Sequence, residues 1–212
     1  SYGLVVGYVQ SGKTANFTAL LAKAADSGFD LFVVLSGMYN DLRQQTQMRL
    51  DRELVGDSTE TDEPHVDGTG FTRRWNKVTN DSMDNGDIHQ SGANLDLEQI
   101  RSDSPTLAVT KKQVDALDEL VNWALSIPSA ERGKINLMVI DDEADLASIN
   151  TEAKSNDEKQ ANAINEKLRT FLHLFDRRAY IGYTATPFAN VFVNPHGDGV
   201  VTNIKNREEK MQ

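Results

Sequence analysis

The chain has 212 residues, enough for the core of one α/β domain, and its 39% hydrophobic and 25% charged residues are typical of a globular protein. No run approaches the roughly 18 apolar residues of a membrane helix, and no leader-like segment is recognisable, so we expect a cytoplasmic protein with no membrane partner. The absence of cysteine excludes disulfides and thiolate metal sites, and a formal charge of −10 argues against a broadly basic nucleic-acid surface.

The first part of the chain alternates apolar runs with helical segments. Residues 4–7 predict a short buried strand, and residues 13–25 predict an amphipathic helix. The apolar face of that helix carries Phe17, Leu20, Leu21 and Ala24. Residues 30–37 form a second continuous apolar run, and residues 39–54 have helical composition. Unbroken apolar strands alternating with helices are typical of a parallel sheet covered on both faces.

An acidic insertion, about residues 55–104, interrupts this alternation. Residues 51–103 contain thirteen Asp and Glu against five Lys and Arg, a net charge of −8. The sizeable apolar residues of the insertion are Phe71, Trp75 and Val78, so we expect it to be partly ordered. The two aromatic side chains either stack on a nucleic-acid base or attach the insertion to the core.

The alternation resumes after the insertion. Three further apolar strands are predicted, over residues 106–112, 134–145 and 179–187. Two helices are predicted between them, over residues 114–126 and 162–175. We therefore expect one α/β lobe over residues 1–193, followed by a polar tail over residues 194–212.

A glycine-punctuated turn follows the first predicted strand. Residues 7–14, GYVQSGKT, fit the pattern G-x-x-x-x-G-K-[ST] between a strand and a helix. Glycines let successive backbone N–H groups surround a phosphate, and the helix N-terminus adds unpaired donors and a positive dipole. The candidate phosphate-binding residues are Gln10, Ser11, Gly12, Lys13 and Thr14. Lys13 would reach the β- and γ-phosphates and Thr14 would bind Mg²⁺; a chance match is the alternative.

An acidic motif follows the apolar run of residues 137–140. Residues 141–145, DDEAD, carry four carboxylates, and the ends of parallel strands share one edge, so we expect them beside the glycine-punctuated turn. Asp142 would hold Mg²⁺ and Glu143 would polarise the attacking water, so Lys13, Asp142 and Glu143 are the predicted catalytic residues. A solvated acidic turn is the alternative, although Mg²⁺ and Lys13 would relieve the repulsion among the carboxylates. Together the two motifs predict binding of a nucleoside triphosphate.

Two further features carry a resemblance to a known superfamily. Residues 142–145 spell the DEAD form of motif II, and YTATP, residues 183–187, contains the Thr-Ala-Thr of motif III, so the chain resembles superfamily-2 helicases and translocases. Segments across residues 3–193, among them GYVQSGKTANF, LRQQTQMRL, VIDDEADLASINT and GYTATPFANVFV, also resemble the helicase-like region of bacterial Z1-domain proteins, which are often labelled endonucleases.

The resemblance implies a P-loop NTPase fold, a single RecA-like lobe with a mostly parallel sheet flanked by helices. It implies an ATPase that uses ATP and Mg²⁺, with Thr184 and Thr186 coupling the nucleotide to DNA. By position, the candidate nucleic-acid contacts are Ser36, Arg43, Gln44, Arg49 and Lys111, with Thr110 and Lys112 beside the last. Arg and Lys at such positions would give salt-sensitive, sequence-independent affinity; a solvated helix face and a charged strand end are the alternative.

A superfamily-2 motor also needs a second RecA-like lobe that donates arginine fingers. The sequence contains no second phosphate-binding lobe, so we expect a fragment of a larger bacterial DNA-processing or defence protein, weak or inactive alone. A nucleotide-gated interaction module without hydrolysis, or the structural platform of a nuclease, is the alternative function. Asp145 followed by residues 152–154, EAK, is only a faint nuclease pattern, and TKKQVD does not match a guanine-reading motif.

Overall fold

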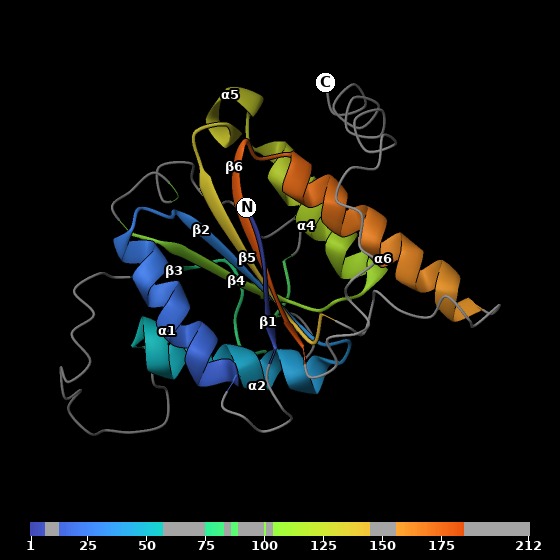
Figure 1. The fold of residues 1–212 in the computed structure, drawn as a ribbon, viewed down its shortest axis with the longest axis horizontal. Helices are drawn as coiled ribbons and strands as arrows, with labels where there is room; N and C mark the ends of the chain where they lie inside the picture. Colours follow the sequence, from blue (N-terminus) through green and yellow to red (C-terminus); the bar gives the residue numbers. More distant parts are fainter. Residues whose placement is uncertain are drawn as a thin grey trace.

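This computed structural model describes residues 1–6, 13–56, 75–82, 86–88, 100, 104–144 and 156–184. They contain one six-stranded sheet with the order β1-β6-β5-β2-β4-β3, and every neighbouring pair of strands is parallel (Figure 1). The strands are β1 (Tyr2–Val6), β2 (Leu31–Ser36), β3 (Asn76–Lys77), β4 (Thr106–Thr110), β5 (Asn136–Asp142) and β6 (Arg177–Thr184). The predicted α/β class is confirmed.

Helices cover both faces of the sheet (Figure 1). One face carries α1 (Lys13–Asp26), α2 (Asn40–Leu50) and the π-helix η1 (Asp51–Val55). The other carries α4 (Val114–Ser126) and α6 (Asn156–His173), and the short α5 (Ser129–Arg132) precedes β5. No helix in the described ranges is both long enough and apolar enough to cross a bilayer.

The central strands are apolar throughout because both of their faces are buried. In β2, Phe32 and Val34 belong to the core beneath α1, whereas Leu31, Val33 and Leu35 belong to the core beneath α4 and α6. All five are completely buried, and each such side chain contributes roughly 1.5–3 kcal/mol of hydrophobic stabilisation. The period-2 alternation of a strand distributes this burial between the two layers.

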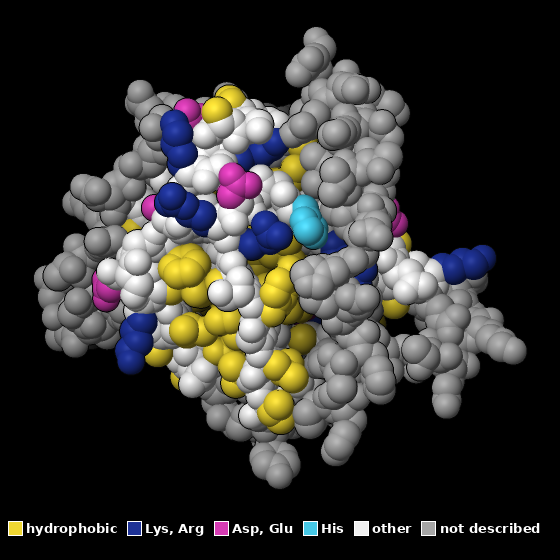
Figure 2. Space-filling view, turned by 45° about the horizontal axis from the view of Figure 1, so that its top comes forward, with side chains coloured by type: hydrophobic (Ala, Val, Ile, Leu, Met, Phe, Trp, Pro, Cys, Tyr) yellow, Lys and Arg dark blue, Asp and Glu magenta, His cyan; other side chains and the backbone are white. Residues whose placement is uncertain are grey.

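The first strand differs from the prediction of a buried strand. It is an edge strand bonded to β6, and Tyr2, Leu4 and Val6 are 54%, 47% and 54% exposed. The core beneath α4 and α6 takes its strand residues from β2, β4 and β5, which leaves one face of β1 open. Figure 2 shows a face of the molecule on which hydrophobic side chains gather. The apolar run of β1 is thus not explained by burial on both faces.

The described parts of the acidic insertion are attached to the core. Trp75 is buried, with its ring centroid 5.0 Å from that of Phe32, so this residue anchors the insertion and does not stack on a base. The prediction overlooked Ile88 and Ile100, which are buried in the opposite core, and the pairing of β3 with β4. Phe71 lies outside the described residues.

Candidate functional site

The carboxyl ends of four neighbouring strands, β1, β6, β5 and β2, lie side by side along one edge of the sheet. In the register, Val6 at the end of β1 pairs with Thr184, and Asp142 at the end of β5 pairs with Tyr183. Ser36, the last residue of β2, pairs with Asp142. The strand that precedes the glycine-punctuated turn and the strand that carries the acidic motif therefore end at the same edge, with β6 between them.

Helix α1 begins close to this edge. The Tyr183 hydroxyl, near the end of β6, donates a hydrogen bond of 2.8 Å to Asn16 Oδ1 in the first turn of α1. The rings of Phe17 and Tyr183 meet edge to face with centroids 5.7 Å apart. Residues 7–12, which include Gln10, Ser11 and Gly12, lie outside the described residues, as do the side chains of Lys13 and Thr14. The predicted strand before these residues and the predicted helix after them are both present.

The pleat of β5 separates its two aspartates. Val139 belongs to the core beneath α4 and α6, and Ile140 belongs to the core beneath α1. Because alternate residues of a strand share a face, Asp141 points toward α4 and α6 and Asp142 points toward α1. Asp141 is buried and Asp142 is partly exposed. Burial, followed by the negative charge of Asp142, raises the pKa of the Tyr183 hydroxyl above its usual value. Asp142 is thus the aspartate on the side of α1.

Asp141 belongs to a buried ion pair, which its place in the cluster of four carboxylates did not predict. Lys112 Nζ lies 2.5 Å from Asp141 Oδ1, and the Tyr180 hydroxyl donates a hydrogen bond of 2.6 Å to Asp141 Oδ2. Lys112 is 1% exposed, so it does not form the nucleic-acid contact predicted beside Lys111. The period of β5 could have separated the two aspartates, but nothing in the sequence identifies Lys112 as the partner.

The turn after β5 holds Glu143 in an uncommon conformation. Its φ of 64° lies in the left-handed region that L-residues rarely adopt. The Glu143 carbonyl accepts a hydrogen bond of 2.9 Å from Lys112 Nζ, and the next N–H, of Ala144, donates to the Tyr183 carbonyl at 2.9 Å. A Cβ on Gly182 would lie 2.9 Å from Ala144 Cβ, so the turn packs closely against β6.

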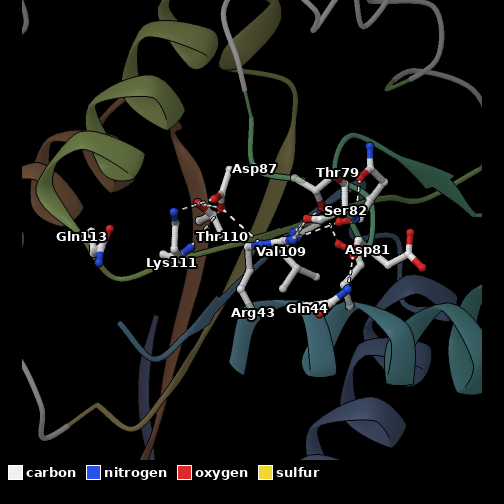
Figure 3. Close-up of polar contacts among 12 residues, drawn as sticks. Arg43, Gln44, Thr79, Asp81, Ser82, Asp87, Val109, Thr110, Lys111 and Gln113 are labelled. Carbon is white, nitrogen blue, oxygen red and sulfur yellow. Dashed lines mark hydrogen bonds and ion pairs between the residues drawn. The ribbon is translucent and has the colours of Figure 1, made fainter. Parts of the chain in front are cut away.

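The predicted nucleic-acid contacts are mostly engaged within the protein (Figure 3). Arg43 is fully buried; it donates 2.7 Å from Nη1 to the Asn80 carbonyl and also bonds the Ser82 carbonyl, and its Nε lies 3.8 Å from Asp87. Ser36 is 2% exposed. Because buried side chains do not reach a phosphate, Arg43 and Ser36 are removed from the set of candidate contacts.

The other three candidates keep some exposure. Gln44 Nε2 donates to the Asp81 carbonyl at 2.8 Å, Arg49 pairs with Glu53 at 3.0 Å, and Lys111 pairs with Asp87 at 3.1 Å. The coupling candidate Thr184 is completely buried at the end of β6. Thr186 and Asp145 lie outside the described residues.

The environment of the Tyr180 hydroxyl leads us to expect that the stability of the fold depends on pH. Burial, followed by the negative charge of Asp141, raises the pKa of Tyr180 well above 10.0 in the folded protein. The unfolded chain therefore loses this proton first as the pH rises, and stability that is complete below about pH 10 is lost above it. We expect the free energy of unfolding to fall there by up to about 1.4 kcal/mol per pH unit for this group.

Urea unfolding at several pH values on either side of 10.0 measures this slope in the wild type and in Tyr180→Phe. The variant should show a shallower fall, with the remaining part due to other groups such as Tyr183. An equal fall of the free energy of unfolding with pH in the two proteins would contradict the assignment of this effect to Tyr180.

Comparison with known proteins assigns no family to the chain, because neither a protein-family model nor a curated protein matches it. Within the described part of the chain, no cluster of three or more His, Asp or Glu could hold a metal ion. Mg²⁺ does not require such a cluster, because it is commonly bound by one or two carboxylates, water and substrate phosphates. The partly exposed Asp142 is a ligand of the type that Mg²⁺ prefers.

Proposed function

We propose that the chain is the ATP-binding and ATP-hydrolysing lobe of a DNA-acting motor, with a RecA-like P-loop fold. One observation carries the proposal: Tyr183 contacts the first turn of α1 and is paired in the sheet with Asp142. The segment that begins with Lys13 and the acidic end of β5 thus converge on one edge. That is the convergence a phosphate loop and a metal carboxylate require.

In this proposal the chain itself supplies binding and orientation. Residues 10–14 would supply backbone donors to the phosphates, and the ammonium of Lys13 would balance their charge. Asp142 and the Thr14 hydroxyl would hold Mg²⁺, which would supply positive charge to neutralise the phosphates. Glu143, in the hydrogen-bonded turn after β5, would orient the water that attacks the γ-phosphate.

The DNA part of the proposal rests on the resemblance to superfamily-2 and Z1-domain proteins. Gln44, Arg49 and Lys111 remain the candidate contacts because they retain exposed surface, whereas the buried residues of the original set do not. Their contribution would be salt-dependent. A second RecA-like lobe would supply the transition-state arginines, so turnover by this chain alone should be slow.

Titration calorimetry with MgATP tests the nucleotide site. We expect binding by the wild type and a loss of affinity of about a hundredfold or more in Lys13→Ala, because a charged phosphate contact is removed. Lys23→Ala is the matched control, since it removes an exposed lysine in the last turn of the same helix. Equal affinity in the wild type and Lys13→Ala would refute the proposed site.

A further inference from the structure

Lys112 connects the ends of three strands at the edge where the proposed site lies. It follows β4, its backbone N–H donates to the carbonyl of Gly37 after β2 at 2.7 Å, and its ammonium reaches β5. Nζ lies 2.5 Å from Asp141 Oδ1 and donates to the Glu143 carbonyl at 2.9 Å. Lys112 is 1% exposed, so these contacts form away from solvent.

The two contacts of the ammonium have different consequences. A buried ammonium is strongly unfavourable unless a charge partner compensates for its lost hydration, and the Asp141 carboxylate provides that partner. The bond to the Glu143 carbonyl does not neutralise charge. It restrains the peptide group that follows a residue with a φ of 64°, a conformation that persists only when its surroundings enforce it.

The backbone of Glu143 determines where its carboxylate lies. Glu143 Oε2 is 3.5 Å from the position that a Cβ on Gly37 would occupy, so the carboxylate lies beside the glycine that Lys112 also bonds. Gly37 itself has a φ of 55°, which favours glycine there. Lys112 therefore bonds the carbonyl of Glu143 itself and the carbonyl of Gly37, the glycine beside this carboxylate.

We propose that Lys112 is a positioning residue for Glu143: its ammonium, neutralised by Asp141, holds the left-handed backbone that directs the Glu143 carboxylate over Gly37. The inference rests on the proposed function for the role of Glu143 in hydrolysis. The positioning of Glu143 by Lys112 is a property of the chain without nucleotide. It can therefore be tested separately from the role of Glu143 in hydrolysis.

The test compares Asp141→Asn with Lys112→Met/Asp141→Asn in the full chain. Both proteins lack the buried ion pair, and the asparagine that replaces Asp141 keeps an oxygen for the Tyr180 hydroxyl, so they differ in the donor to the Glu143 carbonyl. Lys167→Met/Asp118→Asn is the control, because it removes a 2.7 Å ion pair between α6 and α4. The measurements are the backbone carbon-13 chemical shifts of residue 143, MgATP affinity by calorimetry and single-turnover hydrolysis of ATP.

We expect Asp141→Asn to be less stable than the wild type, because the buried Lys112 amino group loses its charge partner, but this group still donates to the Glu143 carbonyl. Asp141→Asn and the control should therefore keep the left-handed shifts of residue 143. Lys112→Met/Asp141→Asn should lose them, retain MgATP affinity within about threefold and hydrolyse ATP about a hundredfold more slowly, as expected for a misplaced catalytic group. If this double variant does not fold, Lys112→Gln/Asp141→Asn replaces it, since glutamine is polar but one atom shorter than lysine.

Unchanged left-handed shifts at residue 143 in the folded double variant would overturn the inference, as would hydrolysis at the rate of Asp141→Asn. A wild-type chain that binds no MgATP would count against the proposed function instead. The chemical shifts would still decide whether Lys112 holds Glu143.

Discussion

Replacing Arg43 with methionine should lower the free energy of unfolding by about 3 to 5 kcal/mol, the range typical of breaking a buried charged contact. Arg43 is completely buried and bonds the carbonyls of Asn80 and Ser82, with Asp87 nearby (Figure 3). Methionine fills similar space but leaves both carbonyls and the carboxylate without this partner. Chemical denaturation of the two proteins measures the difference.

The matched control is Arg49→Met on the same helix, α2. Arg49 is partly exposed and pairs with Glu53 at 3.0 Å, and pairs of this kind contribute about 0–1 kcal/mol. Hydrogen exchange of residues 79–82 should increase in Arg43→Met and not in Arg49→Met. Similar small losses of stability in both variants would contradict the structural role assigned to Arg43.

Replacing Glu143 with glutamine should reduce single-turnover ATP hydrolysis by about 10²- to 10⁴-fold, the usual contribution of a positioned general base. Glutamine keeps the size of the side chain and can occupy the same turn, but its amide cannot accept the proton of the attacking water. Affinity for MgATP should stay within a few fold, because the proposed site holds the phosphates with residues 10–14. Rapid-quench measurement of the product and calorimetry provide the two quantities.

Glu166→Gln makes the same chemical change on an exposed part of α6 and should leave hydrolysis unchanged. Glu143→Gln with wild-type hydrolysis would reject Glu143 as the group that orients water. A wild type that binds MgATP without any hydrolysis, with or without DNA and a second lobe, would favour a nucleotide-gated interaction module.

Local sequence patterns predicted much of the fold. The helix expected over residues 114–126 is α4, and the apolar face expected for residues 13–25 is the face of α1 that packs against the core. The continuous apolar runs of β2 and β5 indicated strands of a parallel sheet covered on both faces, and these two strands lie at its centre. These features follow from side-chain periodicity over a few residues, which is information that the sequence contains directly.

By itself, the sequence determined the alternation of the five longer strands with α1, α2, α4 and α6 and the position of the acidic motif at the end of β5, but not β3 or α5. Only the tertiary structure decided that β1 is an open edge, that Arg43 is buried, and that Asp141 pairs with Lys112 while Asp142 faces α1. The physical reason is that burial and pairing depend on neighbours distant in the chain. Arg43 bonds a carbonyl 39 residues away and Lys112 one 31 residues away, and local periodicity does not encode such contacts.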